Sequence, residues 1–274
     1  MKKLLIALAI TVLVTSNAFA FSIGEYRGPL EFKFTDFGTG TLYGSSSVGY
    51  GNADGIEDAW GVFKVATIKT ADLSATTLWY DGKDGEQLTG IYYGIDDDFW
   101  ALNGVGGINI QSVDGFIDVY LDTTTSFNAA PGPGARVGNT YPTVTDGSTF
   151  LNLAFGSGIK FGNAFIGDDH IVYDNNLDAT TSPFTGDGAF YLDVIGGNYA
   201  PMFNSDYYAL VDDSGATHYR DFFGQFDTST TGAGKWLVKS EDPIGGKAVP
   251  EPTSMLLFGV GLLGIGAIRR KRAV

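Results

Sequence analysis

The residues that could carry catalysis are few. The chain contains two histidines, His170 and His218, and no cysteine, which excludes cysteine nucleophiles and thiolate metal sites. Asp169 precedes His170, but no G-x-S-x-G pentapeptide is present to supply a serine nucleophile. We therefore expect Asp169 and His170 to lie in a solvated turn, and we predict no catalytic residue.

Carboxylate pairs, which glycoside hydrolysis requires, are abundant in the sequence. They occur at residues 57–58, 96–98 and 212–213. Neighbouring residues of a strand point to opposite faces, so adjacent aspartates make poor partners and no pair stands out. A secreted glycan hydrolase remains an alternative to a non-enzymatic protein.

Two acidic segments could instead bind a cation, at residues 52–58 and 174–178. Ca²⁺ binds carboxylate, amide and carbonyl oxygens on loops that can wrap around it. Neither segment follows the twelve-residue EF-hand spacing, so solvated acidic turns are the alternative. The sequence predicts no cofactor, with a structural Ca²⁺ left open, and the candidate ligands are Asp54, Glu57, Asp58, Asp174 and Asp178.

Three tyrosines, Tyr92, Tyr120 and Tyr191, fall on the polar faces of predicted strands. A tyrosine ring has an apolar body and a polar tip, so an exposed ring could stack on a sugar while nearby Asp and Asn bind its hydroxyls. The alternative is that a second sheet or a loop covers these rings. They are candidate glycan contacts, and a carbohydrate-binding module is an alternative function.

The elements that must position these residues are strands. Apolar residues alternate with polar ones in short segments, and 39 glycines mark frequent turns, which is typical of half-buried antiparallel strands. Residues 60–68 are apolar on both faces except for Lys64 and Thr67, which predicts a central strand. We expect an all-β fold, an antiparallel β-sandwich or jelly roll, with strands at residues 30–34, 60–68, 76–80, 91–95, 117–121, 151–155, 171–173, 190–194, 219–226 and 235–239.

The longest polar stretch, at residues 122–146, contains Pro-Gly-Pro-Gly. It could be a mobile loop or a boundary between two β lobes. We favour one extracytoplasmic domain at residues 21–248, because neither half alone shows a complete set of strands.

The first twenty residues predict export. Lys2 and Lys3 precede an apolar stretch at residues 4–14, and Ala18 and Ala20 give small residues at the recognition positions before a cut. This arrangement is that of a secretory signal peptide cleaved after Ala20. The alternative, an uncleaved anchor, is disfavoured because the apolar stretch is too short to span a bilayer.

Residues 249–274 combine prolines, an apolar run and positive charges. Pro250 and Pro252 favour an extended strap, and residues 253–268 carry no charge. As a helix this run covers roughly 24 Å, against a hydrocarbon core of about 30 Å. A basic cluster follows and should stay cytoplasmic, and it consists of Arg269, Arg270, Lys271 and Arg272.

This segment resembles the PEP-CTERM sorting signal of exported bacterial proteins, with Pro250, Glu251 and Pro252 at the motif positions. The resemblance implies recognition by an exosortase, transient anchoring in the inner membrane through the C-terminal helix, and release or attachment at the cell surface. It also implies a role in exopolysaccharide-associated biofilm or floc formation, whereas a plain C-terminal anchor is the alternative. Residues 57–63 and 85–94 are similar to a flocculation-associated branch of the family.

The charge of the chain bears on its partners. The formal net charge is −14 at pH 7, which disfavours binding to nucleic-acid phosphates. We expect extracellular polysaccharide and exosortase as partners, and an exported location, secreted or in the surface matrix.

Overall fold

The computed structural model describes residues 21–40, 53–102, 107–157, 173–178, 185–211 and 215–250. The antiparallel all-β fold class is confirmed. Within the described residues the helical pieces are short, namely α2 (Ala200–Phe203), η1 (Lys83–Gly85) and η2 (Pro133–Ala135). The strands are β1 (Pro29–Gly40), β2 (Ala59–Thr70), β3 (Thr77–Tyr80), β4 (Gln87–Leu102), β5 (Gly107–Val113), β6 (Phe116–Asp122), β7 (Ser148–Gly156), β8 (Tyr173–Asp178), β9 (Thr185–Gly196), β10 (Tyr208–Val211), β11 (Thr217–Arg220), β12 (Phe222–Ser229), β13 (Val238–Ser240) and β14 (Pro243–Lys247).

The main sheet closes on itself. Its strands pair in the circuit β1, β2, β4, β6, β7, β9, β12, β14 and back to β1. The long strands β4 and β9 extend beyond β6 and β7, and there β5 and β8 bridge them instead. The closed, sandwich-like sheet leaves few free strand edges and encloses one continuous inner face.

That inner face holds the main core. Alternate residues of β1 point inward, as the sequence predicts, and Leu30, Phe32 and Phe34 are all buried. At one end of the core Phe21 packs edge-on against Phe150, with ring centroids 4.8 Å apart. β2 is central, between β1 and β4, as predicted.

Glycines let large rings cross the inner face. Gly61 lies opposite Tyr92 in the β2–β4 pairing, and a Cβ on Gly61 would lie 2.3 Å from the Tyr92 hydroxyl oxygen. Gly90 lies opposite Phe63 in the same way, and a Cβ on Gly90 would lie 2.2 Å from the Cζ atom of the Phe63 ring. Any residue larger than glycine at position 61 or 90 would collide with these rings. The two glycines therefore let the Tyr92 and Phe63 rings lie across the neighbouring strand, in the interior of the sheet.

The segment at residues 122–146, expected as a mobile loop or a lobe boundary, packs over the outside of the sheet. Its buried side chains join two from the sheet and two from the segment before β13, which explains why β2 is apolar on both faces. We call this group the outer cluster, and it consists of Val62, Ile91, Ala129, Tyr141, Val144, Ala233 and Trp236.

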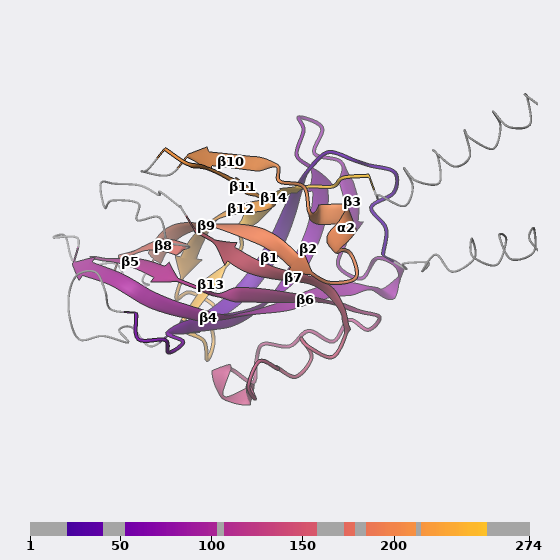
Figure 1. The fold of residues 1–274 in the computed structure, drawn as a ribbon. Coiled ribbons are helices and arrows are strands. Elements are labelled where there is room, and N and C mark those ends of the chain that lie inside the picture. The colour runs from indigo at the N-terminus through magenta and orange to yellow at the C-terminus, as the bar shows by residue number, and fades with distance from the viewer. Residues whose placement is uncertain are drawn as a thin grey trace, which may run out of the picture.

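The strand expected at residues 219–226 is divided in two. β11 ends at Arg220, and its one partner among the described strands is β10, in a hairpin that lies beside β12 and β14 (Figure 1). The carboxylate of Asp221 accepts hydrogen bonds from the backbone N–H groups of Val194, Ser205 and Asp206. These bonds hold the chain in a corner at Asp221, after which β12 enters the main sheet.

Candidate functional site

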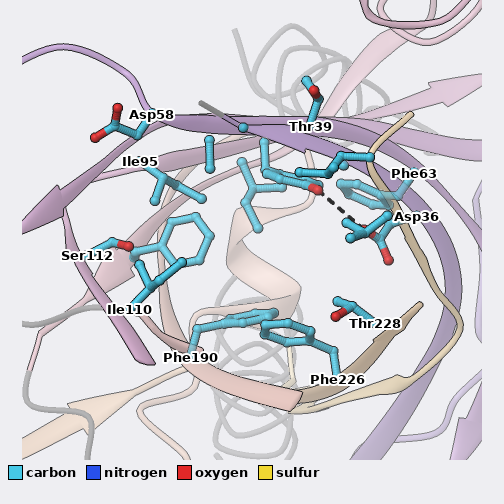
Figure 2. A pocket seen from close by; sticks show the side chains of 18 of the residues that line it. Asp36, Thr39, Asp58, Phe63, Ile95, Ile110, Ser112, Phe190, Phe226 and Thr228 are labelled. Carbon is cyan, nitrogen blue, oxygen red and sulfur yellow. Dashed lines mark hydrogen bonds between the residues drawn. The ribbon is translucent and has the colours of Figure 1, made fainter. Parts of the chain in front are cut away.

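The closed sheet contains a cavity of about 150 Å³. Its walls come from β1, β2, β4, β5, β6, β7, β9, β12, β13 and β14, and most of the lining side chains are apolar. Figure 2 shows Phe63, Ile95, Ile110, Phe190 and Phe226 around the cavity. Concave, mainly apolar spaces with a few polar groups are the usual form of small-molecule sites.

One wall of the cavity carries two buried oxygens without a partner. Asp36 on β1 and Thr228 on β12 each lie opposite Ser240 of β13, so all three side chains share one face. Asp36 accepts a hydrogen bond from the Tyr92 hydroxyl at 3.3 Å through Oδ2. Its Oδ1 and the Thr228 Oγ1 have no hydrogen-bond partner among the described residues.

A second polar group, on β4 and β5, faces the cavity from another side. The Ser112 hydroxyl donates to Asp97 Oδ1 at 2.8 Å. The backbone N–H of Asp97 donates to Asp58 Oδ2 at 3.0 Å. The cavity is therefore apolar with carboxylates on two sides.

Burial changes the acidity of these carboxyl groups. It raises the pKa of Asp36 to about 6, and the nearby hydroxyls of Ser240 and Tyr92 only partly offset this cost. Burial also raises the pKa of Asp97 to about 7, against the hydrogen bond from Ser112 and with the charges of Asp58 and Asp96 adding to the rise. Both groups thus change charge between weakly acidic and neutral pH.

The chain leaves the closed sheet next to the prolines singled out above. The backbone N–H of Ala248 donates to the Gly28 carbonyl at 3.0 Å, and that of Val249 donates to the Met202 carbonyl at 2.9 Å. Ala248 is buried, whereas Pro250 is exposed. Backbone hydrogen bonds therefore fix the chain to the body as far as Val249, and Pro250 is the first exposed residue after them.

Residues 248–272 match the family model of the PEP-CTERM protein-sorting motif. The chain carries a PEP-CTERM sorting motif. The match confirms the resemblance of this segment and implies an exported protein that is targeted to exosortase for processing at its C-terminus. No curated protein and no solved structure matches the chain.

Most of the PEP-CTERM motif lies outside the described residues. This holds for Glu251 and Pro252, for the apolar run at residues 253–268 and for the basic cluster, and equally for the signal-peptide residues Ala18 and Ala20 and for His170. In the part of the chain that the structure describes, no helix is long and apolar enough to cross a membrane.

The acidic turn before β2 is held by hydrogen bonds and an ion pair. The Glu57 carboxylate accepts from the Arg136 guanidinium and, at 2.7 Å, from the Gly94 backbone N–H. Asp54 is exposed and accepts from the N–H of Ile56, whereas Asp58 is buried at the cavity. The three carboxylates thus face different surroundings.

The second acidic segment differs from its expected form. Asp174 and Asp178 lie within strand β8, paired on both sides with β5 and β9, instead of on a loop that could wrap a cation. Among the described residues no group of three or more His, Cys, Asp or Glu side chains is placed to hold a metal ion. The structural Ca²⁺ stays a prediction.

The three tyrosines are half-buried rather than open to solvent. Tyr92 points into the cavity because its neighbour Ile91 takes the outward position in the outer cluster. Tyr120 packs against the same cluster. The ring centroid of Tyr191 lies 4.8 Å from that of Phe223 and 6.4 Å from that of Tyr208 in the β10–β11 hairpin. Loops and a hairpin therefore cover rings that the sequence suggested as an open face.

Asp36 was not singled out from the sequence, although one signal was available, and Asp58 and Asp97 were noted only as members of acidic runs. The inward positions 30, 32 and 34 of β1 continue to Asp36 at the same spacing of two. Asp97 could not be found in this way. Gly94 has a φ of 72°, and inward residues change from even to odd numbers between Tyr92 and Ile95, both of which line the cavity.

Proposed function

We propose that this protein is a non-enzymatic component of the cell surface or the extracellular polysaccharide matrix, where it supports biofilm or floc formation after exosortase processing. The observation that carries the proposal is the sorting motif at residues 248–272. It follows directly on a closed β body, to which Ala248 and Val249 are joined by backbone hydrogen bonds. No cofactor is part of the proposal.

The junction between body and motif supports processing beyond Val249. A cut before Ala248 would remove two backbone hydrogen bonds and a side chain that is 1% exposed. Pro250 lacks an N–H and cannot extend that hydrogen-bonded pairing. A cut beyond Pro250 would therefore keep both hydrogen bonds and the buried Ala248 side chain.

Mass spectrometry of the protein from its native cells tests the processing step. We expect a C-terminus between Val249 and Pro252 in normal cells, and the full tail through Val274 in cells without exosortase. Replacing Pro250, Glu251 and Pro252 together by alanine should also leave the full tail in place. Pro131→Ala, at an exposed proline of the body, is the matched control and should be processed normally. An intact tail in normal cells would contradict the proposal and favour a plain membrane anchor.

The non-enzymatic part of the proposal is supported by the size of the cavity. A space of about 150 Å³ is that of one benzene-sized ring. Glycoside hydrolysis needs two carboxylates that flank a bond between two sugars, and such a substrate is larger than this cavity. The inward-facing carboxylates are therefore poor candidates for a glycosidase pair.

The similarity of residues 57–63 and 85–94 to the flocculation-associated branch supports the matrix role. These residues form the β2–β4 pairing that holds Gly61, Phe63, Gly90 and Tyr92. The acidic charge of −14 suits contacts through bridging cations. A carbohydrate-binding module is the second candidate, although the half-buried positions of Tyr92, Tyr120 and Tyr191 do not favour it.

Deletion of the gene tests the matrix role. We expect the deletion strain to lose floc or biofilm mass, and the wild-type chain to restore it. A chain ending at Val249 should restore less, because it lacks the sorting motif. Unchanged floc mass in the deletion strain would contradict the matrix role, while full restoration by the shortened chain would separate that role from sorting.

A further inference from the structure

The size and lining of the cavity limit what it could hold. Its volume of about 150 Å³ matches cavities that take up a single benzene ring. Leu237 lines the cavity and is also 38% exposed, so its side chain lies on the solvent side of the wall. A compact ring could enter by displacing this side chain.

The unpartnered oxygens specify the polar part of a ligand. Asp36 is 9% exposed and Thr228 is 7% exposed, and their Oδ1 and Oγ1 atoms lack hydrogen-bond partners. Figure 2 shows both side chains on the same side of the cavity. A purely apolar ligand would leave both atoms unsatisfied, which is unfavourable.

A hydroxyl group matches these two atoms. It has one hydrogen to donate to Asp36 Oδ1 and lone pairs to accept from the Thr228 hydroxyl. A buried ammonium group would need three acceptors, and the described lining residues offer two oxygens without a partner. A carboxylate ligand would be repelled by Asp36 and by Asp242, whose charge acts on Asp36.

We propose that the cavity binds a single-ring, otherwise apolar alcohol of about the size of phenol, with its hydroxyl between Asp36 and Thr228. The inference concerns the β body alone and does not depend on the sorting motif or on the matrix role.

Titration of the full-length chain with phenol tests the proposal, with benzene and benzylamine as comparison probes. Labelled isoleucine methyl groups report the site by NMR, since Ile95 and Ile110 line the cavity. Ile68 is fully buried outside it and serves as an internal control. We expect saturable shifts at Ile95 and Ile110 with phenol, no shift at Ile68, and weaker binding of both other probes.

The variant Thr228→Val removes the hydroxyl at nearly constant volume. It should weaken phenol binding about five- to tenfold and leave benzene binding unchanged, and Thr228→Ser should restore phenol binding. Ala59→Leu, which places a larger side chain at the cavity wall, should weaken both probes. Absence of saturable shifts, tighter binding of benzylamine, or equal effects of Thr228→Val on phenol and benzene would each overturn the proposal.

Discussion

Replacing Trp236 by alanine is expected to lower the free energy of unfolding by about 3–5 kcal/mol. Trp236 is 6% exposed and lies at the centre of the outer cluster. Its ring centroid is 5.2 Å from that of Trp60 and 5.8 Å from that of Tyr141. Its Nε1–H also donates to the Ala129 carbonyl at 2.7 Å. The substitution therefore opens a cavity and removes the shortest hydrogen bond to the Ala129 carbonyl, which then keeps the Gly132 N–H at 3.0 Å.

The loss should be greatest where the segment at residues 122–146 meets the sheet. The Arg136 guanidinium lies 4.4 Å from the centroid of the Trp60 ring and binds Glu57. Contacts with Trp60 and Trp236 therefore pack this segment against the sheet. We expect the melting temperature to fall by roughly 6–20 °C, and limited proteolysis to cut within residues 122–146 earlier than in the wild type.

Two further variants keep this prediction testable. Trp236→Phe retains most of the ring but loses the N–H, and it should cost about 1–3 kcal/mol. Val137→Ala, at a side chain in the same segment that is 76% exposed, should change stability by less than about 0.5 kcal/mol. If Trp236→Ala melts as the wild type does, the outer cluster does not stabilise the fold.

Raising the pH from 5 to 8 is expected to destabilise the folded protein, by on the order of 3 kcal/mol. The folded pKa is about 6 for Asp36 and about 7 for Asp97, whereas an unfolded aspartate has a pKa of about 3.9. The folded state therefore binds more protons than the unfolded state between these values. The stabilising contribution is full at the acidic side and is lost as the pH rises through the folded pKa values.

Thermal melting of the wild type and of Asp97→Asn between pH 5 and pH 8 tests this sign. The wild type should melt roughly 6–12 °C higher at pH 5 than at pH 8. Asp97→Asn keeps an oxygen for Ser112 but cannot ionise, so it should lose much of this slope and be more stable than the wild type at pH 8. Asp146→Asn, at an exposed turn, should keep the wild-type slope. An unchanged slope in Asp97→Asn would show that the pKa of this carboxyl is not raised in the folded state.

Much of the fold could be predicted from local patterns. Alternation over a few residues placed most strands of the main sheet, because a side chain's face in a regular strand depends only on its neighbours in sequence. The sorting motif was equally accessible, since prolines, an apolar run and a basic cluster act in linear order. The apolar character of both faces of residues 60–68 correctly indicated a central strand.

The candidate site depended on pairings that the sequence does not show. Asp36, Ser240 and Thr228 come from β1, β13 and β12, and only the closed sheet puts them in register. The glycine at position 94 shifts the inward face of β4, so Asp97 and Tyr92 both point inward although their numbers differ by five. The covering of Tyr120 and Tyr191 by a loop and a hairpin likewise required the tertiary structure.

The sequence by itself therefore determined the strand-rich class of the protein and its sorting motif, since both are written in short contiguous stretches. Only the tertiary structure decided that the sheet closes, that the tyrosines are covered, and that carboxylates and hydroxyls from distant strands meet around an apolar cavity. The physical reason is that strand register and closure depend on long-range pairing, and one shifted residue turns a side chain to the opposite face.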